Sequence, residues 1–388
     1  MAALPIDACR PPPLAGIRVL DLSRLLPGPL CAQHLADLGA QVIKIEDPKV
    51  GDYVRPAIRD LANRGKEGLT LDLKSGEGRE IFLALLDQAD VVLESFRPGV
   101  MARLGLGYGV LAARRPAIVH CAITGYGQTG PRRDAAGHDI NYLAATGVLD
   151  QTGRDGDPPV IPGFLLSDIL GGTLTAAMGI LAALVDARAT GHGRHVDVSM
   201  ADAVMAHCVL PAAELNERGA VHARGSGTHT GGQPRYNVYA ARDGRYIAVG
   251  AQEKKFWDAL CDALGVADLK DRRQPSEADA VEVRARLAAA FARRDAAEWV
   301  ATLTPLDCCV SAVLTCEEAF ADPGFAARGT VHNAGRGVIT LGLPLAISGH
   351  ACPVERASPA RGEHSTAILG RLGYDAARIE GLRARGVI

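Results

Sequence analysis

The sequence predicts an α/β protein whose large domain is an open parallel sheet with helices on both faces. Short apolar runs typical of buried strands alternate with helical apolar stripes along the first two hundred residues. Strands in such a strand–helix–strand order pair in parallel through right-handed crossovers. A chain of 388 residues, 48% of them hydrophobic, is long enough for a large core and a second domain.

The first crossover unit opens the chain. Residues 17–22 and 41–45 have the pattern of buried strands, and residues 30–38 between them carry a helical apolar stripe. The Pro-Gly-Pro segment at 27–29 breaks the chain before this helix, and Gly39 suits its C-terminal cap. We therefore expect two neighbouring parallel strands joined by one helix.

The same alternation continues to residue 124. It predicts strands at 69–73, 90–94 and 118–124, and helices at 78–88 and 110–115. Ligands of open α/β sheets bind beyond the carboxyl ends of the strands. Three segments follow predicted strands in this way, at 46–48, 95–99 and 125–127. We expect the ligand-binding edge of the sheet there.

A long apolar helix is predicted at 169–185, and residues 196–200 form a strand that leads into another helix. The apolar run approaches the length of a membrane span. Its glycines and its end at Asp186 favour a helix buried in protein instead. We expect no membrane span.

A smaller α+β unit follows a loop at 218–233 that is rich in Gly, His and Thr. The Asp-Gly pair at 243–244 between strands at 236–240 and 246–249 predicts a β-hairpin. Helices are expected near 256–264 and 281–293, and the last helix of the chain ends at Arg383. The expected division is a large domain beginning at 1–200, a linker at 201–228, a small α+β domain at 229–305, a linker at 306–330, and a C-terminal part at 331–388 that returns to the large domain.

Composition excludes several classes of protein. The net charge of −2 argues against a general nucleic-acid binder, which would present a basic face. Nine scattered cysteines without a Cys-x-x-Cys pair indicate free thiols in a reducing cytosol and disfavour a zinc site. Residues 1–13 lack the apolar run of a secretory signal. We expect a cytoplasmic protein with no bound metal and no nucleic-acid partner.

Two side chains are candidates for proton transfer. His138 lies in a glycine-led turn at 137–142, and Asp168 lies at the start of the long apolar helix. A base and an acid on opposite sides of one carbon can remove a proton from one face and return it to the other. Taken singly, Asp168 fits a helix N-cap, and His138 fits a hydrogen-bonded structural histidine. Glu253, just after the predicted hairpin, fits either a helix start or a carboxylate that orients an imidazole.

Two residues are candidates for binding a phosphorylated ligand. Arg97, in Phe-Arg-Pro-Gly after a predicted strand, has the guanidinium fork that suits phosphate, and Lys74 is a weaker candidate. The Gly-x-Gly pairs at 107–109 and 225–227 do not complete a dinucleotide-binding loop, and the chain has no Walker lysine motif. No redox cofactor is therefore predicted.

Taken together, these segments resemble the class III CoA-transferase superfamily (CaiB/BaiF-like), and within it the α-methylacyl-CoA racemase branch. The motifs that carry the resemblance lie at residues 14–22, 27–29, 38–46, 96–100, 124–131, 362–365 and 369–388. They span nearly the whole chain and are specific in combination. The segment 137–142 is similar to the catalytic-histidine segment of racemases, which transferases usually lack, and 243–253 is similar to the racemase segment that supplies a supporting glutamate.

The resemblance implies a role for each catalytic candidate. His138 and Asp168 become the opposed acid and base of a racemase. Glu253 supports His138, and a backbone N–H near Asp139 donates to the thioester oxygen. In the transferase branch, Asp168 is instead the nucleophile that forms an acyl anhydride, and His138 is structural.

The implied ligand is an acyl-CoA, with CoA as part of the substrate and no separate cofactor. Contacts to CoA are expected at Arg97, Lys74, Ile45 and Gly125. The implied subunit is a ring made of a Rossmann-like large domain and a smaller domain, and two subunits interlock as a homodimer. The active site then lies between the large domain of one chain and the small domain of the other, with Glu253 near His138.

Two functions follow as alternatives. The first is racemisation of 2-methylacyl-CoA thioesters by 1,1-proton transfer through an enolate. The second is transfer of CoA between an acyl-CoA and a free carboxylic acid through an aspartyl anhydride on Asp168. A third possibility, a non-catalytic CoA-ester-binding protein, gives no reason for two opposed proton-transfer groups.

Three features depart from the racemase pattern. Asp47 stands where some racemases carry a phosphate-binding basic residue. Residues 231–234 partly echo the glycine-rich loop of transferases, and Arg235 and Asn237 interrupt the tyrosine-rich pattern common in racemases. Branched fatty, bile-acid-like, aryl-propionyl and succinyl-type thioesters are all open as substrates.

Overall fold

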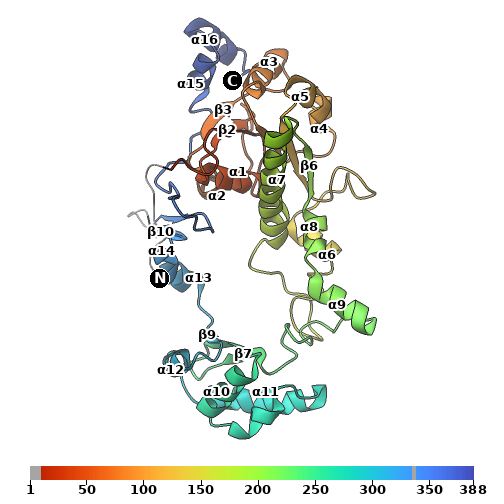
Figure 1. Ribbon diagram of the computed structural model, residues 1–388, viewed down its shortest axis with the longest axis vertical. Coiled ribbons are helices and arrows are strands. Elements are labelled where there is room, and N and C mark those ends of the chain that lie inside the picture. Colours follow the sequence, from red (N-terminus) through yellow and green to blue (C-terminus); the bar gives the residue numbers. More distant parts are fainter. Residues whose placement is uncertain (1–9, 334–337) are drawn as a thin grey trace. The chain divides into compact units, whose positions relative to one another are not determined.

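The computed structural model describes residues 10–333 and 338–388, and the chain divides into two compact units (Figure 1). Unit 1 contains the chain up to Thr146 and the segments Phe164–His207 and Asp322–Ile388. Unit 2 contains Gly147–Gly163 and Cys208–Ala321. These units differ in their bounds from the expected domains, whose boundaries stay a prediction.

The segment Gly147–Gly163 accounts for the main difference, because the sequence analysis places it in the large domain. Arg224 of unit 2 donates to the backbone carbonyl of Asp150 at 2.5 Å and to that of Asp157, and its guanidinium also pairs with the Asp150 carboxylate at 3.0 Å. These bonds tie the segment to unit 2. The chain also returns to unit 1 at Asp322 instead of at residue 331.

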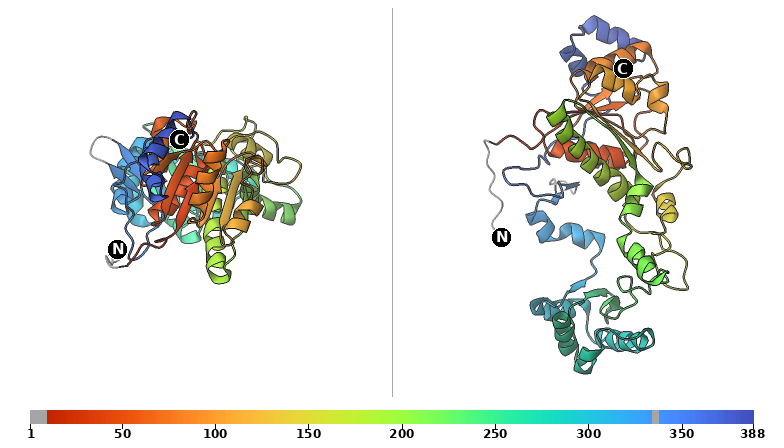
Figure 2. Two further views of the ribbon diagram at one scale, coloured as in Figure 1. Left: turned by 90° about the horizontal axis from the view of Figure 1, so that it is seen from above. Right: turned by 45° about the vertical axis from the view of Figure 1, so that its right-hand side comes forward.

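Unit 1 contains a six-stranded sheet in which every neighbouring pair of strands is parallel. The strands are β1 (Arg18–Asp21), β2 (Gln41–Glu46), β3 (Glu67–Thr70), β4 (Val91–Glu94), β5 (Val119–Thr124) and β6 (His195–Ser199). Their order in the sheet is β3-β2-β1-β4-β5-β6, and the left view of Figure 2 shows strands of the sheet side by side. The predicted open parallel sheet is confirmed.

Helices connect and cover these strands. They are α1 (Pro27–Asp37), α2 (Pro56–Asn63), α3 (Gly76–Leu86), α4 (Val100–Arg103), α5 (Tyr108–Arg114), α6 (Asp139–Ala145), the π-helix η1 (Ser167–Leu174), α7 (Thr175–Thr190), α8 (Met200–Ala206), α14 (Pro323–Ala327), α15 (Ser365–Arg371) and α16 (Ala376–Ala384). A short antiparallel pair, β10 (Val331–Asn333) and β11 (Ile339–Leu341), also belongs to unit 1.

The sheet has a separate apolar core on each face, because successive strand residues point to opposite faces. Val19 of β1 lies in the core shared with α1 and α7, whereas the next residue, Leu20, lies in the core shared with α3, α5, α15 and α16. In β4, Val91 and Leu93 belong to the first core and Val92 to the second. Figure 1 shows α1 and α7 on one side of the sheet and α3, α15 and α16 on the other.

Some elements differ from the sequence prediction. The strand expected at 69–73 is β3, which ends at Thr70 because its partner strand β2 ends at the paired residue, Glu46. The helix expected at 169–185 begins as the π-helix η1, and only from Thr175 is it α-helical. The helices α2 and α6 are short, so too few apolar residues repeat along them to reveal a helical period.

Unit 2 combines a three-stranded antiparallel sheet with helices. Its elements are α9 (Val209–Arg218), β7 (Tyr236–Ala240), β8 (Tyr246–Gly250), α10 (Lys254–Leu264), η2 (Ala267–Arg272), α11 (Glu277–Phe291), α12 (Ala296–Leu303), η3 (Thr304–Leu306), β9 (Val310–Ala312) and α13 (Cys316–Ala321). The predicted hairpin is confirmed by the antiparallel pairing of β7 and β8. Trp257 and Trp299 are buried in this unit's core, and their indole N–H groups donate to the carbonyls of Leu269 and Phe291.

A fully buried group of charges lies within unit 1. Lys66 Nζ donates to Asp21 Oδ2 at 2.9 Å and to the Pro29 carbonyl at 2.8 Å, and Lys44 Nζ lies 3.9 Å from the same carboxylate. Burial lowers the pKa of Lys66 to about 8 against the opposing effect of Asp21. Burial would raise the pKa of Asp21, but the two lysines hold it below its ordinary value. These contacts join β1, β2 and the start of α1.

The continuous helix Ser167–Thr190 has the length and apolar composition of a membrane span, a test that core helices also pass. Ala176, Ile180 and Ala183 lie in the core beside α1, whereas Met178 and Val185 are exposed. The absence of a membrane span and the cytoplasmic location stay predictions.

Replacing Asp21 with Asn should lower the free energy of unfolding by about 3–5 kcal/mol, because two buried lysines lose their common carboxylate. Guanidinium denaturation followed by circular dichroism measures this loss. Asp87→Asn is the matched control, since Asp87 pairs with Arg114 at the surface and its loss should leave the midpoint nearly unchanged. Equal effects of the two substitutions would contradict the assigned role of the buried group.

Candidate active site

A cavity of about 520 Å³ lies at the carboxyl ends of β1, β4 and β5 in unit 1. Its charged and polar lining includes Arg24, Arg97, Arg133, His138, Asn141 and Asp168. The order of the strands reverses between β1 and β4, and ligands of open α/β sheets bind at such a switch point. The edge expected from the sequence is therefore the edge that holds this cavity.

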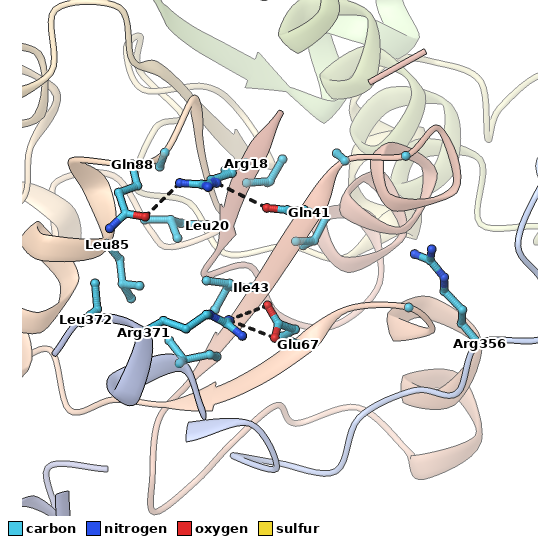
Figure 3. Close-up of a pocket in the computed structure, with 17 residues that line it drawn as sticks. Arg18, Leu20, Gln41, Ile43, Glu67, Leu85, Gln88, Arg356, Arg371 and Leu372 are labelled. Atoms are coloured by element: carbon cyan, nitrogen blue, oxygen red, sulfur yellow. Dashed lines mark hydrogen bonds and ion pairs between the residues drawn. The ribbon is translucent and has the colours of Figure 1, made fainter. Parts of the chain in front are cut away.

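A second cavity of unit 1, of about 620 Å³, lies at the opposite edge of the sheet, where β1, β2 and β3 begin (Figure 3). Its polar groups bind one another: Arg371 pairs with Glu67 at 2.8 Å, and Arg18 donates to Gln88 at 2.9 Å and to Gln41 at 3.3 Å. None of the candidate residues lines it. The smaller cavity is therefore the candidate active site.

His138 occupies the N-cap position of α6. Its backbone N–H donates to Asn141 Oδ1 at 3.0 Å, and its imidazole is exposed at the cavity. The sequence analysis expects a turn here, and the structure adds the short helix that follows it. The Asn141 side chain accepts this backbone N–H in the way the third helical residue does in a capping box.

Asp139 connects the two proton-transfer candidates. It is buried, and its Oδ1 accepts the backbone N–H of Asp168 at 3.0 Å. This bond ties the start of η1 to the start of α6, so Asp168 and His138 line the same cavity. The expected partnership of the two side chains thus has a direct physical link in the neighbouring carboxylate.

The electrostatics of Asp168 suit a group that both gives and takes a proton. Burial and, to a smaller extent, the nearby Asp139 raise the pKa of its carboxyl to about 6, while His138 opposes the shift. A pKa near the working pH keeps both the acid and the carboxylate forms available.

The π-helix η1 places Asp168 in its first turn. A Cβ atom on Gly171 would lie 2.6 Å from the Met200 carbonyl oxygen, and one on Gly172 would lie 2.6 Å from Pro27 Cβ. The two glycines thus allow η1 to pack closely on the starts of α8 and α1. Short π-helical turns are frequent at functional sites, where they re-aim a side chain.

Tyr142 lines the cavity, and its ring packs closely against two glycines. A Cβ atom on Gly125 would lie 2.4 Å from the tyrosine ring, and one on Gly137 would lie 2.7 Å from it. The Tyr142 hydroxyl donates to the Gly137 carbonyl at 2.6 Å, and burial raises its pKa to about 12. Gly125, expected to contact CoA, therefore also gives this ring its space.

The four residues predicted to contact CoA differ in their position relative to the cavity. Arg97 and Gly125 line the cavity, whereas Ile45 is buried in a core and Lys74 is exposed outside the lining. Asp47 accepts the backbone N–H groups of the two residues that follow Pro48, at 2.9 and 3.0 Å, so its carboxylate closes a turn. The roles of all four in binding CoA stay predictions.

Two cations of the lining, Arg24 and Arg133, were not predicted from the sequence. Arg24 follows β1 as Arg97 follows β4, so the rule that sites lie beyond strand ends could have found it. Arg133 lies in the loop between β5 and α6 and pairs weakly with Asp134, at 3.6 Å. No local pattern marks it.

Glu253 belongs to unit 2, at the N-cap position of α10. Its side chain is exposed and makes no capping hydrogen bond in the described structure. Arg235, one of the departures from the racemase pattern, is buried nearby and donates to the side chain of Gln252 at 2.8 Å. The role of Glu253 toward His138 stays a prediction.

Among residues 10–333 and 338–388, no group of three or more His, Cys, Asp or Glu side chains is placed to hold a metal ion. No disulfide joins the eight cysteines in these ranges. The expectation that the protein works without a metal stays a prediction.

Comparisons with known proteins identify the family of the chain. Residues 14–365 match the family model of CoA-transferase family III. The human alpha-methylacyl-CoA racemase is 37% identical over 97% of both chains, and the acetyl-CoA:oxalate CoA-transferase of Acetobacter aceti is 36% identical over 89% of this chain and 91% of its own. A CaiB/BaiF family protein from Brucella suis superposes with a TM-score of 0.83 at 30% identity, covering 94% of this chain and all of that one. The resemblance found in the sequence is confirmed.

Asp168→Asn should stabilise the protein at alkaline pH. A carboxyl whose pKa is raised on folding favours the folded state while it is protonated. Its contribution to the free energy of unfolding is fully present below pH 3.8, the ordinary pKa of the group, and is lost as the pH rises through about 6. The unfolding midpoint of the variant should therefore exceed that of the wild type at pH 8, and the advantage should shrink by pH 4. Asp134→Asn, at an exposed carboxylate of the same lining, is the control. A constant difference between pH 4 and pH 8 would contradict the raised pKa.

Proposed function

The chain belongs to CoA-transferase family III, and from this membership we propose that it is an isomerase that racemises 2-methylacyl-CoA thioesters. The observation that carries the proposal is the presence of His138 and Asp168 in one cavity, joined through Asp139. Acyl transfer through an anhydride needs only the carboxylate. Proton transfer between two faces of a carbon needs both groups.

In the proposed reaction, neutral His138 takes the α-proton of the thioester from one face, and an enolate forms. Asp168 in its acid form then delivers its proton to the opposite face of the same carbon. For the other enantiomer, the Asp168 carboxylate takes the proton and the imidazolium returns one. The bonds balance, because one C–H bond breaks and one forms in each turnover.

The enolate oxygen needs stabilisation, because a proton beside a thioester carbonyl is only weakly acidic. The first N–H groups of a helix have no acceptor within the helix, and the N-terminal end carries a partial positive charge. The backbone N–H of Asp139, at the start of α6, is the proposed donor to this oxygen. CoA is part of the substrate, and no separate cofactor takes part.

The proposed active form is the interlocked homodimer that the family resemblance implies. In that form, Glu253 of the partner subunit would orient the imidazole of His138. The exposed position of the Glu253 side chain, free of a capping bond to its own helix, supports this role.

The second candidate function is CoA transfer. Asp168 would attack the thioester carbonyl, release CoA as a thiolate and carry the acyl group as a mixed anhydride; a second carboxylate would then take the CoA. The sequence identity of 36% to the Acetobacter aceti transferase supports this alternative. His138 would then be structural.

His138→Ala separates the two functions. For a racemase, loss of the base should lower kcat for racemisation by about 100- to 10,000-fold. Chiral chromatography of the acyl group after hydrolysis measures this rate, and the release of CoA to added succinate measures transfer. A variant that still racemises at the wild-type rate would contradict the proposal.

The pH dependence tests Asp168 in the direction where its carboxylate is the base. Because its pKa is about 6, kcat/KM in that direction should fall tenfold per unit below pH 6. Asp139→Asn removes a like charge, so the acidic limb should move to lower pH. An unmoved limb would show that another group titrates there.

Mixed dimers test the shared site. His138→Ala and Glu253→Gln subunits, each inactive alone, should regain about a quarter of wild-type activity when coexpressed, since half of the dimers then hold one intact site of two. Single-mutant homodimers purified separately and mixed without subunit exchange are the control. No recovery in proven mixed dimers would place both residues in one chain's site, and a fully active Glu253→Gln homodimer would remove the role of Glu253.

A further inference from the structure

An arginine at the edge of the candidate active site is held between two aromatic rings. The guanidinium carbon of Arg24 lies 5.3 Å from the ring centroid of Tyr53 and 5.3 Å from that of Phe96. Its backbone N–H donates to Ser95 Oγ at 2.9 Å. A planar guanidinium whose faces meet rings keeps its N–H edges for other partners.

The loop that carries Arg24 is held by a hydrogen bond to a buried, charged side chain. The next residue, Leu25, has a φ of +66°, which a non-glycine residue rarely adopts. Its N–H donates to Asp52 Oδ1 at 2.8 Å, and the buried carboxylate of Asp52 lies 3.5 Å from Lys44 Nζ. Such strain persists where the surroundings impose it, and it is common at binding sites.

The edges of the Arg24 guanidinium are left without an anion. Within the described ranges, Arg24 forms no direct ion pair, and its one side-chain hydrogen bond is a long contact of 3.5 Å to the Tyr53 hydroxyl. A cationic fork that is rigidly held but unpaired has lost its conformational entropy before a ligand arrives. Asp47 is close enough for Arg24 to help lower its pKa, but this carboxylate accepts the N–H groups of Lys49 and Val50, so the guanidinium keeps donors for an anionic ligand.

The surrounding charge selects a polyanion. Arg97 and Arg133 are exposed in the lining of the same cavity, and Asp134 is the carboxylate that offsets one of them. Tyr53 is 61% exposed and offers an aromatic surface beside Arg24. Phosphates joined to a heterocyclic base match both features, and bidentate guanidinium–phosphate pairs are strong.

We propose that Arg24 binds a phosphate of the CoA nucleotide and so determines the preference of this protein for CoA thioesters over pantetheine thioesters. The proposal rests on the proposed function only in taking CoA as the carrier of the acyl group, which the racemase and the transferase share. Arg24 acts on binding and takes no part in proton transfer.

Calorimetric titration of the full chain with free CoA and with free pantetheine tests this role. Arg24→Gln should weaken CoA binding by about 10- to 100-fold, since a charge-assisted hydrogen-bond pair is lost, and should leave pantetheine binding unchanged. Arg24→Lys keeps the charge without the fork and should fall between the two. Arg114→Gln, at a surface arginine paired with Asp87, is the matched control.

Kinetics add a readout that a merely structural residue would not give. With an acyl-CoA substrate, Arg24→Gln should raise KM and leave kcat nearly unchanged, whereas with the acyl-pantetheine thioester neither constant should move. Wild-type CoA affinity in Arg24→Gln, or an equal loss for CoA and pantetheine, would overturn the proposal. Arg24-dependent CoA binding without any α-proton exchange would instead overturn the racemase function and leave this inference standing.

Discussion

One hydrogen bond, from the backbone N–H of Asp168 to the carboxylate of Asp139, holds the candidate active site together. It joins the π-helix η1 to the start of α6, two elements that lie about thirty residues apart in the chain. The same carboxylate also sets the electrostatics, because its negative charge adds to burial in raising the pKa of Asp168. Geometry and proton affinity thus depend on one buried side chain.

A second group of buried charges lies near the edge of the sheet that holds the cavity. Asp21, Lys44 and Lys66 fix the end of β1 and the start of α1, and Lys44 also meets the aspartate that holds Leu25 in its strained conformation. Desolvated charges are costly unless fully paired, so this group stabilises one arrangement of the loop strongly against others. This loop places Arg24 in the lining of the cavity that also holds His138 and Asp168. Arg24 is assigned to binding, and the other two residues are assigned to proton transfer.

The sequence allowed the sheet, the hairpin and the ligand-binding edge to be predicted, because periodicity and turn residues are local signals. His138 and Asp168 were identified as a pair through a family resemblance, since spacing alone made each an ordinary cap or structural residue. The π-helix was not predictable, because it depends on how closely Gly171 and Gly172 approach distant backbone. Arg24 was missed for a similar reason, as its aromatic partners come from two other segments of the chain.

The most direct test of two-sided proton transfer is the position of solvent deuterium at low conversion. A single enantiomer of a 2-methylacyl-CoA is incubated in D₂O with no added acid, and the recovered substrate and its mirror-image product are separated and analysed by mass spectrometry. Two-sided transfer predicts deuterium at the α-carbon of the product while the recovered substrate keeps its protium, because one group takes the proton and another returns a deuteron. A substrate that keeps both its protium and its configuration, yet passes CoA to succinate once that acid is added, would contradict it.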